Sequence, residues 1–319
     1  MSDEIKGSQR LSLKQLQSWE NLKYGMFIHF GMSTFDGEEL SKGDKPSTLY
    51  APDRLDVDQW VSVARDAGMK YAVLTAKHVS GHCLWPTKQT DYHVGTSGNA
   101  TDVVEAFVSA CGKRGVMPGF YYCSWDNHQG VITPSEAGSA FTSRAYQEFQ
   151  TAQIEELLAQ YGRIGEVWID IPVLLPRCYR QELYERIVEL QPETVIMMNN
   201  GIGDGSTYPV DKAWPADIIA IERFLPNSQN GHVRWREIEG RSYYMPGEVC
   251  DPIGREWFYC DGDVPRSDAE LLGMYLVCRT RHANLLLDVP PDRHGLIPQM
   301  HVDALMKLRG NIDKFGGNV

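Results

Sequence analysis

The chain has 319 residues, 42% of them hydrophobic, and a formal net charge of -11 at pH 7. This length allows two ordinary domains or one α/β barrel, and the spread of strand-like runs along the whole chain favours a single barrel domain over residues 1–319. The acidic balance, without any basic run, excludes a nucleic acid or an anionic membrane as the expected partner.

The first twenty residues are polar and charged, without the apolar segment of a signal peptide or a membrane span. We therefore expect a cytoplasmic location for the chain as given, although a chain trimmed of its leader would read the same. The seven cysteines show neither CxxC nor zinc-ribbon spacing, so free thiols are expected.

Eight short apolar runs that end in polar side chains recur along the chain, and segments of helical periodicity separate several of them. This alternation predicts a (β/α)8-like barrel. Irregular loops are expected around strands five to seven, because residues 199–215 are rich in Gly, Asn and Pro. The predicted strands are residues 24–29, 71–75, 117–122, 167–170, 194–198, 218–221, 243–249 and 285–289, and the predicted helices are residues 57–67, 102–114, 144–161, 179–190, 268–280 and 302–308.

Polar groups stand at the C-terminal ends of these strands, which in a parallel barrel all face one rim. Asp170 ends the fourth predicted strand, and Glu222 and Glu248 mark the ends of the sixth and seventh. Two carboxyl groups about 5–5.5 Å apart are what a retaining glycosidase needs, one to attack the sugar and one to protonate the leaving oxygen. Each residue alone also has a structural explanation, as a turn residue or half of a local ion pair.

Other chemistries have weaker support. His78 and His82 are spaced as in metal-binding helices, but Gly81 and the preceding strand argue against a helix there, so no metal is expected. The chain has no G-x-S-x-G elbow and no glycine-rich phosphate-binding motif. We expect no cofactor.

Several segments closely resemble the α-L-fucosidases of glycoside hydrolase family 29, in chain order over residues 19–310. Thr34, Phe35 and Glu39, with residues 246–248 and 257–259, are most similar to the branch that acts on α-1,3/1,4-linked fucose. The other matching segments are KYGMFIHFG at 23–31, AGMKY at 67–71, LTAKH at 74–78, CLWPTK at 83–88, GFYY at 119–122, EVWID at 166–170 and NLLLDVPPD at 284–292.

This resemblance implies a retaining exo-glycosidase that removes terminal α-L-fucose from an oligosaccharide or glycoconjugate without a cofactor. Asp170 would be the nucleophile, and Glu222 is preferred over Glu248 as the acid/base. The remaining positions that match the family's sugar-binding residues are His29, Glu39, His78, Tyr122 and Trp168 for the hydroxyl groups and Trp257 for the methyl side.

The chain also departs from the family pattern. Val79 replaces a histidine that commonly bonds the sugar, a loss for which His82 is a candidate replacement, and Gly201 stands where some members carry an arginine. No C-terminal β-sandwich is expected, which leaves the rim open or completed by a second subunit in a homo-oligomer. Two alternatives stay open: a glycosidase for a related sugar such as an α-L-galactoside, and a catalytically silent fucose-binding protein.

Overall fold

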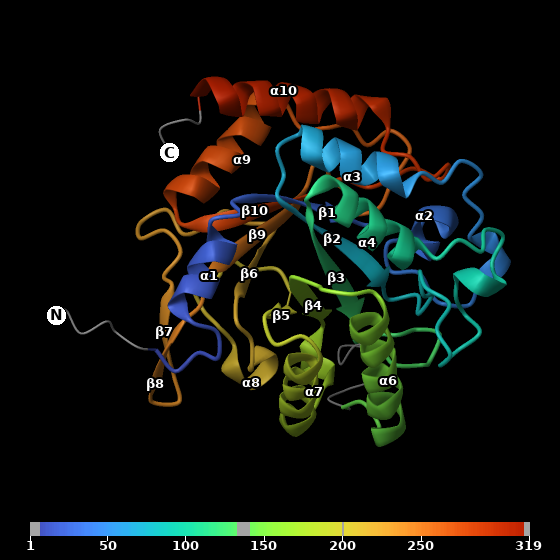
Figure 1. Cartoon of the computed structure of the whole chain (residues 1–319), viewed down its shortest axis with the longest axis horizontal. Coiled ribbons are helices and arrows are strands. Elements are labelled where there is room, and N and C mark those ends of the chain that lie inside the picture. Colours follow the sequence, from blue (N-terminus) through green and yellow to red (C-terminus); the bar gives the residue numbers. More distant parts are fainter. Residues whose placement is uncertain (1–6, 133–140, 200, 316–319) are drawn as a thin grey trace.

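The apolar runs of the sequence form eight parallel strands, hydrogen-bonded in the order β5-β4-β3-β2-β1-β10-β9-β6 (Figure 1). The computed structural model describes residues 7–132, 141–199 and 201–315. The strands are β1 (Tyr24–Ile28), β2 (Tyr71–Lys77), β3 (Met117–Cys123), β4 (Glu166–Asp170), β5 (Val195–Asn199), β6 (Ile219–Glu222), β9 (Gly247–Pro252) and β10 (Ala283–Asp288).

The sheet closes into a barrel between β5 and β6 through a short seam. Met197 and Ile218 form an isolated parallel bridge. The Asp217 backbone N donates to Ile196 O at 2.8 Å, and the Ile196 N donates to Asp217 Oδ2 at 3.0 Å. Arg10 forms an ion pair with the same Asp217 carboxylate. The predicted (β/α)8-like barrel is therefore confirmed, with its weakest pairing at this seam.

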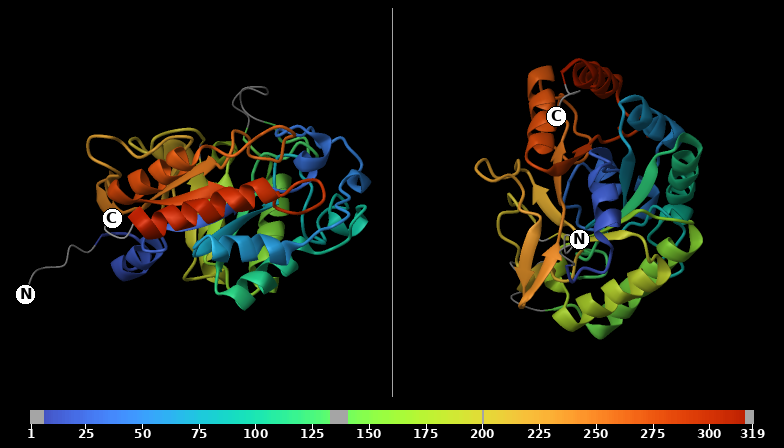
Figure 2. Two further views of the ribbon diagram at one scale, coloured as in Figure 1. Left: turned by 90° about the horizontal axis from the view of Figure 1, so that it is seen from above. Right: turned by 60° about the vertical axis from the view of Figure 1, so that its left-hand side comes forward.

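Helices cover the barrel on two opposite sides, α3, α4, α9 and α10 on one and α6 and α7 on the other (Figures 1 and 2). Polar N-cap side chains such as Asp102 and Ser267 satisfy free backbone N–H groups where these helices begin. The helices are α1 (Leu13–Glu20), α2 (Met32–Asp36), α3 (Val57–Asp66), α4 (Val103–Arg114), α6 (Arg144–Gln160), α7 (Arg177–Leu190), α8 (Val210–Ala213), α9 (Asp268–Thr280) and α10 (Gln299–Phe315), with 3₁₀ turns η1 (Ser47–Leu49), η2 (Val94–Thr96) and η3 (Pro172–Leu174).

The region from β5 to β9 departs from regular β/α alternation, as the sequence predicts. One short helix, α8, connects β5 to β6, and an antiparallel hairpin of β7 (Trp235–Ile238) and β8 (Arg241–Tyr244) lies between β6 and β9. The prediction of one strand over residues 243–249 is wrong, since Tyr243 and Tyr244 belong to the hairpin and β9 starts at Gly247. Pro246, which has no N–H to donate to a neighbouring strand, separates them.

Side chains alternate between the two faces of each strand, so the core has an outer part under the helices and an inner part inside the barrel. On β4, Val167 and Ile169 pack outward against the helices, while Trp168 points into the barrel with a separate cluster of buried side chains. Residues two apart on a strand share a face, so Glu166 and Asp170 also point inward. The α1 side chains Leu16 and Trp19 join the inner cluster from the N-terminal ends of the strands. The opposite end, where Asp170 lies, remains for a functional site.

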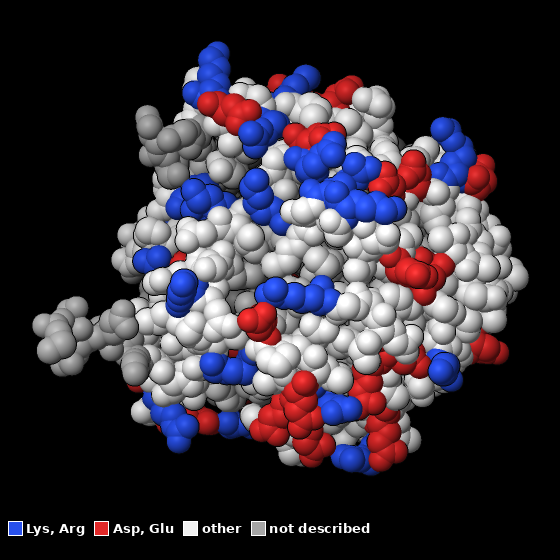
Figure 3. Space-filling model, in the orientation of Figure 1, with Lys and Arg blue, Asp and Glu red and all other residues white. Residues whose placement is uncertain are grey.

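Charge is unevenly spread over the outer surface. On the face shown in Figure 3, acidic side chains gather over α6 and α7, and basic ones are more frequent near α3 and α10. Within the described ranges, no helix is long and apolar enough to cross a membrane. The same ranges hold no cluster of three or more His, Cys, Asp or Glu side chains suited to bind a metal ion.

Candidate active site

A pocket of about 130 Å³ lies at the C-terminal ends of the strands. Asp170 from β4 and Glu222 from β6 supply its two carboxyl groups. Asn199, at the end of the intervening β5, also lines it. The sheet order places β4 beside β5, and the barrel seam places β5 beside β6, so these three side chains come from consecutive strands.

Asn199 bridges the two carboxyl groups. Its Nδ2 donates to Asp170 Oδ1 at 2.9 Å and to Glu222 Oε2 at 2.8 Å. Two oxygens bonded to one nitrogen lie within about 6 Å of each other, which suits the roughly 5–5.5 Å separation of a retaining glycosidase better than the longer spacing of an inverting one. The spacing of the pair is therefore compatible with direct attack by one carboxylate.

Their surroundings give the two carboxyl groups different acidities. Burial raises the pKa of both. For Asp170 three donors counteract this rise in pKa: the Tyr121 hydroxyl at 2.6 Å, Asn199, and its neighbour's backbone N at 3.0 Å. For Glu222 burial and the nearby Asp170 charge raise the pKa to about 7. Near neutral pH Glu222 can therefore hold a proton, and the three donors favour the ionised form of Asp170.

The backbone turns sharply directly after each carboxyl residue. Ile171 has φ 51° and Arg223 has φ 60°, both in the left-handed region that non-glycine residues rarely adopt. Such strain is common at functional sites, where surrounding contacts hold it. The turn at Arg223 places its guanidinium 4.4 Å from the centre of the Trp257 ring and lets it donate to Arg255 O at 2.7 Å.

Two histidines from the predicted set line the pocket as neutral rings. Nδ1 of His29 lies 2.8 Å from Asp288 Oδ1, which assigns that nitrogen the proton and leaves Nε2 free to accept one. Burial lowers the pKa of His29 to about 3 and that of His78 well below its ordinary value. The His78 ring stacks on Tyr121, and within the described structure its Nδ1 has no hydrogen-bond partner. Both rings can exchange hydrogen bonds with sugar hydroxyls.

Aromatic side chains form the walls and the floor. Trp168 packs on Phe27 with ring centres 5.2 Å apart, and Trp257 lies 5.1 Å from His29 at an interplanar angle of 33°. Glu39 lies exposed at the rim. The structure thus brings together Asp170, Glu222, His29, Glu39, His78, Trp168 and Trp257 from the predicted set.

Tyr122 and Glu248 lie outside the pocket lining, in contrast to the prediction. The Tyr122 side chain points outward, where its hydroxyl donates to Gln153 Oε1 at 2.7 Å. Glu248 has no exposed surface and sits deeper in the barrel, where it accepts from the Trp168 indole at 2.9 Å. Its position does not fit an acid/base role at the rim.

Sequence reasoning assigned no role to Tyr121 and Asn199. Tyr121 pairs in register with Trp168 and therefore shares its inward face, whereas Tyr122 pairs with the outward Ile169. For Asn199 the signal was available, since an amide that ends the strand between two carboxyl-bearing strands is placed to contact both.

The departures from the family pattern fall in two places. Val79 and Gly201 both line the pocket, and a side chain added at Gly201 would meet open space. His82 lies away from the pocket, with its ring stacked on Tyr50 and its Nε2 3.2 Å from Ser47 Oγ. The suggestion that His82 replaces the missing histidine is therefore not supported.

Comparisons with known proteins identify the family. The family model for α-L-fucosidases matches residues 43–316. α-L-fucosidase 1 of Arabidopsis thaliana is 32% identical over 92% of this chain, which spans only 58% of that protein's length. A solved structure of a candidate α-L-fucosidase from Bacteroides thetaiotaomicron superposes with a TM-score of 0.80 at 29% identity, covering 99% of this chain and 71% of that one. An α-L-fucosidase of Lactobacillus casei, solved with α-L-fucose, shares the fold at 21% identity, with a TM-score of 0.73 over 95% of this chain and 99% of that one. The chain belongs to the α-L-fucosidase family, glycoside hydrolase family 29.

Proposed function

We propose that this chain is a retaining exo-glycosidase that hydrolyses terminal α-L-fucosides, with Asp170 as nucleophile and Glu222 as acid/base. The observation that carries the proposal is the single Asn199 amide bonded to both carboxyl groups, which keeps two of their oxygens within about 6 Å and so supports a double-displacement mechanism. The membership of the chain in its family supports the identity of the sugar.

The reaction follows from the two acidities. A carboxylate oxygen of Asp170 attacks C1 of the sugar while the C1–O bond to the leaving group breaks, and Glu222 gives its proton to the departing oxygen. This step leaves a fucosyl ester on Asp170 and an ionised Glu222. In the second step Glu222 takes a proton from water, the water oxygen bonds to C1, and the ester bond to Asp170 breaks. The raised pKa of Glu222, about 7, suits a group that must both donate and accept.

The pocket favours one terminal sugar. Phe27, Trp168 and Cys250 line it on the barrel side, and all three are buried. A glycan chain therefore cannot thread past them, which supports removal of an end residue. A neutral His29 and His78 suit hydroxyl groups, and the apolar Trp257 face suits the C6 methyl that distinguishes fucose from galactose.

The proposal extends to the glycosidic linkage by which the fucose is attached. We favour α-1,3/1,4-linked fucose, because Thr34, Phe35, Glu39 and residues 246–248 and 257–259 resemble that branch of the family. A related α-L-galactoside is the second candidate, since Val79 and Gly201 leave room in the lining. Initial rates on p-nitrophenyl α-L-fucoside and α-L-galactoside, and on oligosaccharides with α-1,2, α-1,3, α-1,4 and α-1,6 fucose, would rank these substrates directly.

The stereochemistry of the product tests the mechanism. Proton NMR during hydrolysis of p-nitrophenyl α-L-fucoside should show α-L-fucose first, before mutarotation, and an initial β-anomer would refute the double displacement. The Asp170→Asn variant should lose on the order of 10⁴-fold in kcat/KM because no nucleophile remains. Azide should restore turnover to Asp170→Gly by entering the space of the missing carboxylate and giving a β-L-fucosyl azide. Failure of azide to restore activity in a folded Asp170→Gly protein would argue against Asp170 as the nucleophile.

A further inference from the structure

A second pair of carboxyl groups lies inside the barrel, below the pocket. Glu166 begins β4 and Glu248 is the second residue of β9, and neither has any exposed surface. Both point into the barrel: Trp19 donates to Glu166 and Tyr71 donates to Glu248, and the centres of these two rings lie 6.2 Å apart, so the carboxyl groups are neighbours. No Lys, Arg or His of the described chain forms an ion pair or a hydrogen bond with either of them. Two neighbouring buried carboxyl groups without a cation are not both ionised.

The donors around the pair decide which group keeps the proton. Glu248 accepts two hydrogen bonds, from the Tyr71 hydroxyl to Oε2 at 2.6 Å and from the Trp168 Nε1 to Oε1 at 2.9 Å. Glu166 accepts one, from the Trp19 Nε1 to Oε2 at 3.0 Å, and its Oε1 has no N–H or O–H donor among the described residues. Donors favour the charged form, so Glu248 is the carboxylate and Glu166 Oε1 carries the proton toward it. Burial raises the pKa of both groups, and the nearby Glu248 charge raises the pKa of Glu166 further.

We propose that Glu166 and Glu248 share one proton, held on Glu166, and that the resulting Glu248 carboxylate is a positioning residue that holds the Trp168 indole at the floor of the pocket. Glu166, Trp168 and Asp170 are successive inward residues of β4, so the pair lies directly beneath the proposed nucleophile. Trp168 lines the pocket with Asp170, and its only hydrogen-bonding group faces Glu248. The consequence for catalysis rests on the proposed function; the shared proton does not.

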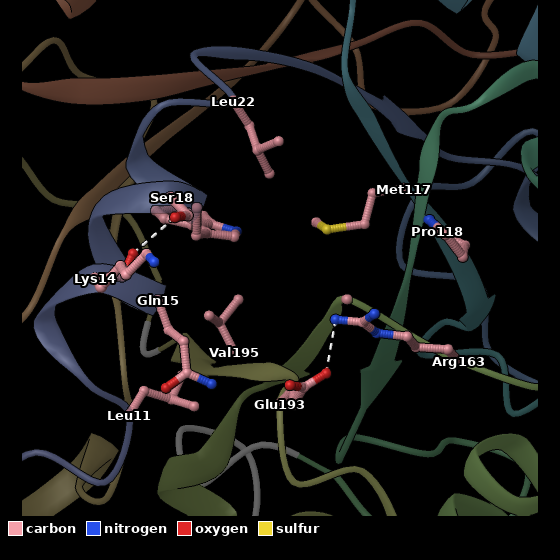
Figure 4. A pocket seen from close by; sticks show the side chains of 12 residues that line it. Leu11, Lys14, Gln15, Ser18, Leu22, Met117, Pro118, Arg163, Glu193 and Val195 are labelled. Carbon is pink, nitrogen blue, oxygen red and sulfur yellow. Dashed lines mark hydrogen bonds and ion pairs between the residues drawn. The ribbon is translucent and has the colours of Figure 1, made fainter.

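The pair is closed off from below by α1. Trp19 lines a cavity of about 710 Å³ at the N-terminal ends of the strands. This cavity lies between α1, β3 and the start of β5 (Figure 4). Leu11, Leu22, Met117 and Val195 form the apolar part of its lining, and the polar part consists of Lys14, Gln15, Ser18, Arg163 and Glu193. Because Trp19 donates its indole N–H to Glu166, the ring lies between the cavity and the carboxyl pair. This placement keeps the shared proton out of contact with solvent.

The titratable groups that face the pair are few. Glu166 and Glu248 face each other, Tyr71 of β2 contacts Glu248, and Cys250 of β9 lies near enough for Glu248 to raise its thiol pKa. Burial and the adjacent carboxyl groups raise the Tyr71 pKa well above its ordinary value. Glu166 is thus the group of this cluster that takes up a proton when the chain folds and releases it when the chain unfolds.

Two matched Glu→Gln variants test the proposal, because they affect the pair differently. In E166Q the amide N–H can replace the shared proton and the amide oxygen can still accept from Trp19, so kcat/KM on p-nitrophenyl α-L-fucoside should stay within about threefold of the parent. In E248Q one oxygen must accept from both Tyr71 and Trp168, and KM should rise about 10-fold or more with a smaller change in kcat. Equal losses of kcat/KM in E166Q and E248Q, or a loss in E166Q alone, would overturn the proposed difference between the two glutamates.

Spectroscopy tests the shared proton without reference to activity. At pH 9, above the Glu222 pKa of about 7, an infrared difference spectrum of parent minus E166Q should contain the C=O stretch of one protonated carboxylic acid, and its absence would refute the proposal. In ¹⁵N-labelled protein the Trp168 indole N–H resonance should shift in E248Q and hold its position in E166Q. If the parent proves inactive on fucosides, these two measurements still decide the matter; if E248Q does not fold, the infrared spectrum of E166Q does.

The pH dependence of unfolding gives a further readout. A carboxyl whose folded pKa is raised favours the folded state below its unfolded pKa and loses this contribution as pH rises above it. For Glu166 this contribution to the free energy of unfolding begins to decrease near pH 4.5, the ordinary pKa of the group. E166Q cannot titrate, so its stability relative to the parent should increase from pH 5 to pH 8 in urea unfolding. A constant difference between the two proteins across this range would contradict a proton held on Glu166.

Discussion

The barrel contains two carboxyl pairs, one at its rim and one in its interior, and they differ in what lies between the partners. At the rim an amide stands between Asp170 and Glu222 and donates to both. In the interior no described residue bridges the pair: Trp19 donates to Glu166, and Tyr71 and Trp168 donate to Glu248. An amide holds two carboxyl groups apart and leaves each free to change charge, whereas a shared proton fixes the charges of both.

Solvent access follows the same division. Asp170 and Glu222 are partly exposed in a pocket where a substrate can enter, and Glu166 and Glu248 are fully buried. The interior pair therefore suits a structural role and the rim pair suits proton transfer. Similar groups are thus suited to different tasks because burial and the intervening donor differ.

The same Glu→Gln change in each pair gives the largest expected contrast. E222Q should lower kcat/KM by about 10²–10⁴-fold on a fucosylated oligosaccharide, because no proton reaches the leaving oxygen, while E166Q should change it little. The loss should be smaller on p-nitrophenyl α-L-fucoside, whose leaving group needs less protonation. Comparable losses for E222Q on the two substrates would argue that Glu222 is not the acid.

The pH profile of the parent sharpens this assignment. Glu222 acts protonated, so kcat/KM should fall as pH rises through about 7, the value to which burial and Asp170 raise its pKa. Asp170 acts ionised, so the acidic limb should lie above the ordinary value of 3.8, in keeping with its raised pKa. In E222Q the alkaline limb near pH 7 should disappear while the acidic limb remains. An alkaline limb that persists in E222Q would belong to another group.

The sequence was sufficient to predict the rim pair, because Asp170 and Glu222 each end an apolar run, and the same runs predicted the barrel. It was not sufficient to place Glu248. The predicted strand ended at residue 249, but β9 continues to Pro252, so Glu248 lies well below the tip. Strand ends depend on which backbone groups find partners in neighbouring strands, and this information is not local.

Tyr122 was chosen over Tyr121 from the family resemblance, and the structure places it on the other face of β3. The strand alternates regularly, with Phe120 and Tyr122 in the outer core and Tyr121 and Cys123 in the inner cluster. Because both faces of a barrel strand are buried and apolar, the sequence of β3 alone does not show which alternate set faces the interior. The irregular connections between β5 and β9 were predicted from their Gly, Asn and Pro content, but the hairpin β7–β8 within them was not.

Removal of the Asn199 amide should have an intermediate effect. Asn199→Leu keeps a similar volume but takes a donor from each carboxylate, and since that donor lowers both pKa values, both limbs of the pH profile should move to higher pH. A hydrogen bond to a charged group is worth about 1.5–3 kcal/mol, so kcat/KM at pH 6 should fall about 10- to 100-fold. Unchanged limbs would mean that Asn199 only fills space between the two groups.

The smallest expected contrast compares the neighbouring tyrosines. Tyr121→Phe removes a donor from Asp170, so its pKa should rise, the acidic limb should move to higher pH, and kcat/KM should fall about 10-fold. Tyr122→Phe removes a bond to Gln153 on the outer side of β3, so it should lower the free energy of unfolding by about 1 kcal/mol and leave the acidic limb in place. The two proteins differ by the same oxygen atom at adjacent positions, which makes each the control for the other. A shifted acidic limb in Tyr122→Phe would show that the outer face of β3 also tunes the nucleophile, and the separation between the rim chemistry and the outer packing would then fail.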